Sequence, residues 1–471
     1  MEPSLANMVR REDAEQIHRA ALRVLRDTGV QVESEGLLRL LSEFGGSADF
    51  DAQRVRFPEA GVEQFIQECE KYDWSQHRPR VGAYAGIYES RYLNPETGVT
   101  ETFTEDTLRD YIRLGNALEE IGGVGLLGLP FVPDDIPAPY LALAEKLYAW
   151  KHHATPSGTV QFTGLCPYIV EMYERRAEEK GEELSDVFGA TGYLISPLRL
   201  ARAECEQVLA FRARGLRMGV GHMVSLGGST PITIAGAAVL ALAETLFLAM
   251  LRSALWGDRR LGVGGFGVVL DMRSIHSMGG RPEAALVSAV LGQVARLYGV
   301  PSWGNGGLTD AKEPSPQAAA QKAMAMVTSV FTNGSSTMDV GLLSLDEILS
   351  PEQMLYDVEL VSAVGRMLRP VEVNAETCAV EEIAEVGPGG NFVGTDLTAS
   401  RFREEVWEPR IWDRQALQDW LSSGGRRERD RVKDRIRALL AEPVAEPGLS
   451  PECERDLRAI IARAVAAGAA S

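Results

Sequence analysis

The chain has 471 residues, of which 45% are apolar and 24% charged, and its formal net charge is −18. This length suits one large domain with additional segments, and the composition is that of a soluble globular protein. A general nucleic-acid binder needs a basic face, which so acidic a chain does not offer, and the charge mildly favours cationic ligands. The odd number of cysteines, none at zinc-site or redox spacing, indicates reduced cytosolic thiols at Cys69, Cys166, Cys205, Cys378 and Cys453.

The N-terminal quarter is predicted to be mainly helical. The stretch "EDAEQIHRAALRVLRDTG" has a capping box at its start and a glycine at its end, which is typical of a complete helix. Further helices are expected over 34–70 and 105–121. Between them, residues 80–103 alternate in polarity and contain the turn "NPETG", which predicts a β-hairpin. The first thirty residues are charged and show no signal-peptide pattern, so we expect a cytoplasmic protein.

One apolar segment, "PITIAGAAVLALAETLFLAML" at 231–251, is long enough to suggest a membrane span. Glu244 interrupts it, and Arg252 and Asp258 follow closely. A charge in the middle of a span is costly in lipid. We therefore predict a buried helix of a large soluble fold, without contact with a membrane.

From residue 123 onward, short strand-like segments alternate with helical ones. Strands are predicted at 124–130, 157–164, 189–195, 218–224, 261–268, 301–306, 335–341 and 370–374. Helices fit between them at 134–151, 199–213, 231–256, 282–297, 315–332 and 351–367, the last beginning with the capping pattern "SPEQ". Eight strands separated by helices predict an α/β fold with an eight-stranded parallel (TIM-type) barrel.

The predicted organisation has three parts. Residues 1–122 form a helical N-terminal region with a β-hairpin, residues 123–397 the (β/α)8 barrel, and residues 398–471 a helical C-terminal tail. The charged run "RRERDRVKDRIRALL" in the tail is typical of a solvated helix face.

The stretch "YGVPSWGNGGLTDAKEPSPQAAAQKAM" at 298–324 gathers several chemical groups at one predicted strand-to-helix junction. In such barrels the chemistry lies at the C-terminal ends of the strands, which places Trp303, Asn305, Asp310 and Lys312 at the mouth. The spacing of a phosphate-binding loop is missing. Plainer roles also fit, because Trp303 suits a barrel core and Asp310 suits a helix cap or a pair with Lys312.

The same argument collects other residues from strand ends. Each also has a plainer role. A histidine within a strand is about as often a hydrogen-bonded core residue as a catalytic one, and aromatic residues at strand ends often belong to the core. Asp271 could simply form an ion pair with Arg273. The further candidates are Phe162, His222, Phe266, Asp271, Asp339, Asn374 and Glu376.

Several stretches, taken in order, resemble one known family. They include "SPLRLARAECEQVLAF", "GGSTPITIAGAAVLALAETLFLAML", "DMRSIHSMGGRPEAAL", the junction at 298–324, "LSPEQMLYDVELV", "EIAEVGPGGNFVG" and "EEVWEPRIWDRQALQDW". Together with "HRAALRVLRDTGVQVE" and "RVRFPEAGVEQFI" near the N-terminus, they are similar to the trimethylamine:corrinoid methyltransferase family. The resemblance extends over about 17–420.

The resemblance implies a barrel enzyme that moves a methyl group from a methylated amine to the cobalt of a partner corrinoid protein. Founding members contain pyrrolysine, whereas this chain has only standard residues and resembles the non-pyrrolysine branch, which includes glycine betaine methyltransferases. It implies that this chain binds no cofactor permanently and that the corrinoid protein presents cob(I)alamin or methylcobalamin. It also implies a homo-oligomer.

This chemistry assigns expected roles to the candidates. A quaternary ammonium leaves as a neutral amine, so the protein needs only to position it in a water-poor pocket with aromatic faces and carboxylates nearby. We expect no metal ligands. We expect Asp310 and His222 to be catalytic, and the substrate-binding residues to be Trp303, Asn305, Phe162, Phe266, Asp271, Lys312, Asp339, Asn391 and Phe392.

Two departures from the family pattern leave alternatives open. Asn391 stands where the family has a histidine in "GPGGHF", and Leu397 stands in place of the histidine of a His-Thr pair. If these histidines contact substrate in relatives, this chain takes another ligand or has lost the reaction. The alternatives are a non-catalytic methylamine-binding sensor or scaffold, and a Schiff-base lyase that uses Lys312.

Overall fold

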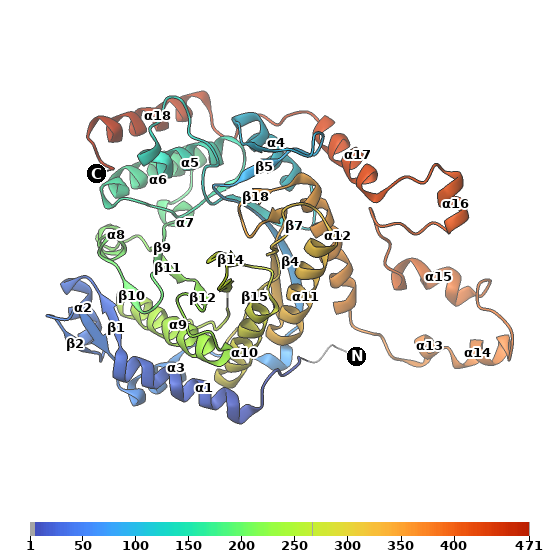
Figure 1. Cartoon of the computed structure of the whole chain (residues 1–471), viewed down its shortest axis with the longest axis horizontal. Coiled ribbons are helices and arrows are strands. Elements are labelled where there is room, and N and C mark those ends of the chain that lie inside the picture. The colour runs from blue at the N-terminus through green and yellow to red at the C-terminus, as the bar shows by residue number, and fades with distance from the viewer. Residues whose placement is uncertain (1–4, 266, 471) are drawn as a thin grey trace.

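A computed structural model describes residues 5–265 and 267–470. Its core is a set of parallel strands that curve around a common axis, with helices packed outside them (Figure 1). The largest sheet has five parallel strands in the order β15 (Gly304–Asn305), β16 (Ser335–Asp339), β4 (Arg80–Ile87), β7 (Ile121–Leu126) and β8 (Thr155–Pro156).

Further parallel pairings join the other strands. β9 (Thr191–Leu194) pairs with β11 (Gly219–His222), and β12 (Val224–Leu226) pairs with β13 (Gly267–Leu270). The Thr191 amide donates to the Gly158 carbonyl oxygen at 2.7 Å, beside β8. A parallel bridge joins Gly265 to Gly304. The fold is therefore mixed α/β with a parallel sheet.

The outer helices come mainly from the segments between these strands. They are α4 (Glu105–Asn116), α5 (Leu141–Lys151), α6 (Cys166–Lys180), α7 (Leu184–Val187), α8 (Arg202–Arg212), α9 (Ile234–Trp256), α10 (Pro282–Tyr298), α11 (Pro316–Asn333) and α12 (Pro351–Leu368). The predicted start of the last helix is confirmed, since the Ser350 hydroxyl accepts a hydrogen bond from the Gln353 amide at 3.1 Å.

The N-terminal region and the connections add smaller elements. Helices α1 (Arg11–Arg23), α2 (Glu35–Glu43) and α3 (Glu59–Glu68) accompany a small sheet of β10 (Arg199–Leu200), β1 (Val30–Val32), β3 (Arg54–Arg56) and β2 (Ser47–Asp49). The remaining short strands are β5 (Arg91–Leu93), β6 (Thr100–Thr102), β14 (Ser277–Met278), β17 (Leu342–Leu343) and β18 (Ile348–Leu349).

The long apolar helix α9 is a core helix. Its length and composition would suit a membrane span, but 67% of its most apolar window is buried within the fold. Glu244, in the middle of the helix, is fully buried and accepts hydrogen bonds from neighbouring strands and loops. This helix thus favours the soluble protein expected from the sequence.

The strand predictions were partly wrong. Residues 80–87 form a central parallel strand, bonded on both sides, and only β5 and β6 make the predicted hairpin around "NPETG". Residues 157–164 contain no strand, because β8 ends just before them. Residues 370–374 are not a strand either: Val371 and Val373 are 61% and 63% exposed, so their alternation reflects no buried face. The three-part domain division stays a prediction.

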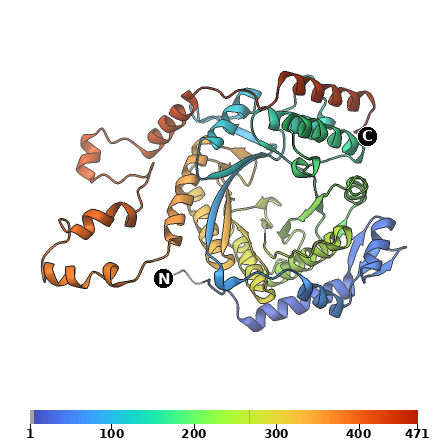
Figure 2. The same ribbon diagram turned by 180° about the vertical axis from the view of Figure 1, so that it is seen from behind.

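The C-terminal segment divides into an arm and a packed tail. Helices α13 (Ala375–Cys378), α14 (Val380–Val386), α15 (Asp396–Glu405) and α16 (Leu417–Ser422) extend away from the body in both views (Figures 1 and 2) and have no buried side chain. The tail returns as α17 (Glu428–Ala441) against α12 and as α18 (Pro451–Ala466) against α5 and α6. The segment from residue 396 onward therefore contains α15, α16, α17 and α18.

One fully buried ion pair joins α11 to α12. Lys322 Nζ lies 2.6 Å from Asp357 Oδ2, and neither side chain is exposed. The same carboxylate accepts hydrogen bonds from the Gly341 amide and the Gln353 side chain, both at 2.8 Å. This carboxylate therefore fastens the chain just beyond β16 to the helix layer.

Replacing Asp357 with alanine should lower the free energy of unfolding by about 3–5 kcal/mol, because it leaves a buried ammonium without its counter-charge. The exposed pair between Arg414 and Glu408 provides the matched control, since Glu408→Ala should change little. Urea denaturation followed by circular dichroism measures both. Equal midpoints for the two variants would contradict the prediction.

Candidate functional site

Aromatic side chains cover glycines on the inner face of the strands, which is the face turned away from the helices. A Cβ atom added to Gly125 would lie 1.7 Å from the hydroxyl oxygen of Tyr84, on the neighbouring strand β4. One added to Gly264 would lie 2.7 Å from the indole of Trp303. Only glycine leaves room for such a close approach. The rings therefore lie directly against the backbone of the adjacent strand.

A third ring repeats this arrangement across the fold. Tyr193 of β9 is paired in register with Gly221 of β11, and a Cβ there would lie 3.5 Å from the Tyr193 ring. Tyr193 is 58% exposed and Trp303 49% exposed. These exposures do not fit the barrel-core role considered for Trp303, and they leave part of each ring accessible to a ligand.

A carboxylate lies beside these rings at the end of β16. Asp339 is paired in register with Tyr84, and its Oδ2 accepts a hydrogen bond from Asn305 Nδ2 at 3.0 Å. Asn305 is held in turn by the Gly307 amide, which donates to its Oδ1 at 2.7 Å. Burial raises the pKa of Asp339, although the bond from Asn305 and the charge of Lys322 act in the opposite direction.

Tyr88, just after β4, completes the group. Burial is the main cause of its raised pKa, and the carboxylates of Asp339 and Asp346 raise it further. We call Tyr84, Tyr88, Tyr193, Trp303, Asn305 and Asp339 the inner-face cluster. It combines electron-rich rings with a carboxylate and contains no basic side chain, which is the composition that attracts an organic cation.

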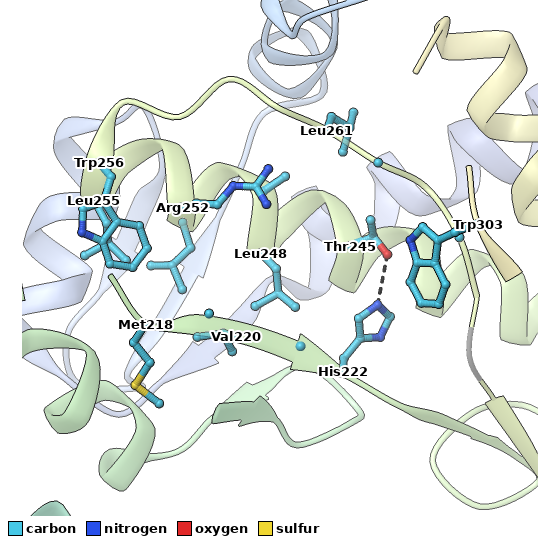
Figure 3. Close-up of a pocket in the computed structure, with 16 residues that line it drawn as sticks. Met218, Val220, His222, Thr245, Leu248, Arg252, Leu255, Trp256, Leu261 and Trp303 are labelled. Atoms are coloured by element: carbon cyan, nitrogen blue, oxygen red, sulfur yellow. Dashed lines mark hydrogen bonds between the residues drawn. The ribbon is translucent and has the colours of Figure 1, made fainter. Parts of the chain in front are cut away.

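A cavity of about 330 Å³ opens beside the cluster, between β11, residues 261–264 and α9 (Figure 3). In the described part of the chain, no backbone hydrogen bond joins β11 to 261–264. The strand edges separate there and α9 forms the floor. The lining is mostly apolar, with a few polar side chains, and its larger residues are Met218, Val220, His222, Thr245, Leu248, Arg252, Leu255, Trp256, Leu261 and Trp303. We call this space the wall cavity.

His222 borders the wall cavity with both ring nitrogens occupied. Nδ1 lies 2.9 Å from Glu244 Oε2, and Nε2 lies 3.0 Å from Thr245 Oγ1. Both partners belong to α9, and Glu244 also accepts hydrogen bonds from Ser196 and from the Leu198 amide. This arrangement ties strand to helix, and a catalytic role for His222 stays a prediction.

Three other predicted residues lie in loops, and their hydrogen bonds within the described part of the chain go to residues outside the inner-face cluster. Asp310 Oδ1 accepts hydrogen bonds from the amides of Gly279 and Gly280 at 2.8 and 3.1 Å, which stabilises a turn. Lys312 is exposed and donates a hydrogen bond to the Asp310 carbonyl oxygen. Asp271 accepts the Arg273 amide in its own loop; this bond and the charges of Arg281 and Arg273 lower its pKa. The structure thus shows bracing roles for these carboxylates.

Among the described residues, no hydrogen bond, ion pair or ring contact joins the remaining predicted residues to the inner-face cluster. Phe162 is 38% exposed beyond β8, and Phe266 lies outside the described residues. Asn391 and Phe392 are exposed on the arm, away from the body (Figures 1 and 2). Asn374 and Glu376, on the same arm, are not at a strand end: Asn374 caps α13 and Glu376 pairs with Arg401.

The sequence analysis missed Tyr84, Tyr88 and Tyr193. The stretch "GAYAGIY" contains the signal, because its alternating small and aromatic residues place glycine and tyrosine on one face of a strand. Because this stretch was predicted to be part of a hairpin, its tyrosines were not considered among the residues at barrel strand ends. Tyr193 lay inside a correctly predicted strand, but only the register with Gly221 shows that its ring is uncovered.

Comparisons with known proteins identify the family of the chain. The family model described as trimethylamine methyltransferase (MTTB) matches residues 157–469. The trimethylamine methyltransferase MttB of Desulfitobacterium hafniense (strain DSM 10664 / DCB-2) is 24% identical over 96% of this chain and 92% of its own length. That of Methanosarcina thermophila is 26% identical over 89% and 90%.

A relative with a different named substrate matches over a similar span. The glycine betaine methyltransferase of Desulfitobacterium hafniense (strain Y51) is 24% identical over 97% of both chains. The relatives named here are all methyltransferases. Because the family model covers well over half of the chain, the protein belongs to the trimethylamine methyltransferase (MTTB) family of enzymes.

Proposed function

We propose that this protein moves a methyl group from a quaternary or otherwise methylated amine to cob(I)alamin on a partner corrinoid protein. The observation that carries the proposal is the inner-face cluster, in which the half-exposed rings of Trp303 and Tyr193 accompany Tyr84, the register partner of the carboxylate Asp339. Aromatic faces with an acid nearby are the usual recognition group for a quaternary ammonium.

The reaction is a transfer of one methyl cation equivalent. The carbon–nitrogen bond breaks, its electron pair stays on the departing neutral amine, and both electrons of the new carbon–cobalt bond come from cobalt(I). The protein's own task is to hold the ammonium, orient the methyl group and limit water around it. Asn305 supports that task by fixing the orientation of Asp339, the counter-charge of the substrate.

Membership of this family also supports proposals about the barrel and about where the corrinoid protein binds. We propose that β4, β7, β8, β9, β11 with β12, the segment 261–265 with β13, β15 and β16 form the eight-stranded barrel expected from the sequence. The corrinoid protein would bind where these strands end, close to the cluster, and supply the cobalt without leaving a permanent cofactor in this chain. A cytoplasmic location and a homo-oligomer stay proposals.

The two alternatives are not equally supported. A Schiff-base lyase needs a lysine in a pocket, whereas Lys312 is exposed and donates to a backbone oxygen. A methylamine-binding sensor was suggested by the missing histidines at Asn391 and Leu397. Both positions lie on the arm, outside the inner-face cluster, so their loss does not remove the cation-binding group.

The proposed reaction is tested by incubating the protein with cob(I)alamin under strict reduction and a panel of quaternary and methylated amines. We expect at least one amine to be demethylated, which is seen as the absorbance change to methylcobalamin. The same assay with the protein's own corrinoid partner tests whether free cobalamin is an adequate acceptor. Ligand binding without turnover in either assay would favour the sensor instead.

Removing one ring of the cluster should weaken binding of a quaternary ammonium. A cation–π contact contributes about 0.5–2 kcal/mol, so Trp303→Ala and Tyr193→Ala should each raise the Kd for tetramethylammonium roughly 2- to 30-fold. Phe50 is 45% exposed near Arg39, outside the cluster, so Phe50→Ala is the matched control. Titration calorimetry measures the Kd values, and no change in either cluster variant would refute the proposed site.

Binding of the cation should also depend on the ionisation of Asp339. Because the pKa of Asp339 is raised, its negative charge is lost as pH falls through a higher value than the roughly 3.9 of a free aspartate. The Kd for tetramethylammonium should therefore increase as pH decreases through that raised pKa. Asp339→Asn should bind more weakly at neutral pH and show no such pH dependence; an unchanged profile would exclude Asp339 as the counter-charge.

A further inference from the structure

The wall cavity and the inner-face cluster share one residue. Trp303 belongs to the cluster and also lines the cavity (Figure 3). Glycines at positions 219, 221, 262 and 264 line the cavity and add no side chain to block it. A ligand with its cationic head at Trp303 could therefore extend its tail toward α9.

The cavity contains a cation with spare hydrogen-bonding capacity. Arg252 of α9 extends into it (Figure 3), and the buried Nε of its guanidinium has no hydrogen-bond partner. Its Nε lies 3.4 Å from Asp258 Oδ2, but that carboxylate also binds Arg260 Nη2 at 2.6 Å. One aspartate is thus shared by two guanidinium groups, which leaves Arg252 able to accept a second anion.

The geometry of α9 sets the length of such a ligand. Thr245 lies next to Trp303, and Arg252 follows seven residues later, about 10 Å along the helix axis. The long arginine side chain spans part of this distance, and a carbon chain must span the rest. The side chains between them, such as Leu248, are apolar and suit methylene groups.

Resting on the proposed function, we propose that the wall cavity is a subsite for the tail of the substrate. The substrate class is a trimethylammonium compound with a terminal carboxylate several carbons away. Its ammonium group lies at the inner-face cluster, its methylene chain lies in the wall cavity, and its carboxylate binds Arg252. A ligand with a single carbon between the two charges cannot make both contacts.

Titration calorimetry on the whole protein tests this subsite with three ligands: trimethylammoniobutanoate, trimethylammonioacetate and butyltrimethylammonium. A hydrogen-bonded charge pair predicts that the butanoate binds roughly 10- to 100-fold more tightly than butyltrimethylammonium. Arg252→Gln should abolish this preference while leaving the affinity for butyltrimethylammonium unchanged. Arg260→Gln is the matched control, because Arg260 shares Asp258 but does not line the cavity.

A second variant tests the subsite without changing Arg252, so that a folding defect of Arg252→Gln cannot be mistaken for loss of the subsite. Leu248→Phe narrows the cavity and should weaken the butanoate at least several-fold, with tetramethylammonium and the thermal unfolding midpoint unchanged. A preference for the carboxylate that persists in Arg252→Gln would overturn the subsite, as would tighter binding of the acetate than of the butanoate. If no quaternary ammonium binds at all, the proposed function fails together with this inference.

Discussion

The structure depends on close contact between an aromatic ring on one strand and a glycine on the next. At Tyr84 over Gly125 and Trp303 over Gly264, any larger side chain would collide with the ring or force it away. The glycines cost stability in a strand because they lose more conformational freedom on folding and pack no side chain. In return, the rings lie against the backbone, and Trp303 stays half-exposed, which suits contact with an organic cation.

Buried carboxylates on the outer helices hold these strands in place. Glu145 of α5 accepts the amide and hydroxyl of Ser157, Glu244 of α9 bonds with three groups from two segments, and Asp357 of α12 accepts the Gly341 amide. Each is almost fully buried, so each must be satisfied by several donors to be tolerated. Strands with so few inward side chains obtain part of their register from these outer contacts.

Some of the site was predictable because chemistry in parallel α/β folds lies at the C-terminal ends of strands. That rule selected Trp303, Asn305 and Asp339, and the structure brings Asn305 and Asp339 into direct contact. It also selected Asp310 and Asp271, which brace turns in the structure, so their site roles stay predictions. A pattern of residues does not distinguish these two uses, because the difference lies in which amides are close in space.

Other errors arose from long-range pairing. Residues 80–87 alternate like a hairpin strand, and only the register with β16 and β7 shows that they occupy the middle of the sheet. Residues 370–374 alternate in the same way but belong to an exposed arm. Arg252 was noted only as a charge after an apolar helix, and its meaning depends on the separation of β11 from 261–264, which no local pattern encodes.

The central claim is that the inner-face cluster binds the ammonium group of a methylated amine. A crystal structure of the protein with tetramethylammonium tests it most directly. The account predicts density for the cation within about 6 Å of the ring centroids of Trp303 and Tyr193, on the side of Asp339. Ordered ligand at another position, with this cluster filled only by water, would contradict it.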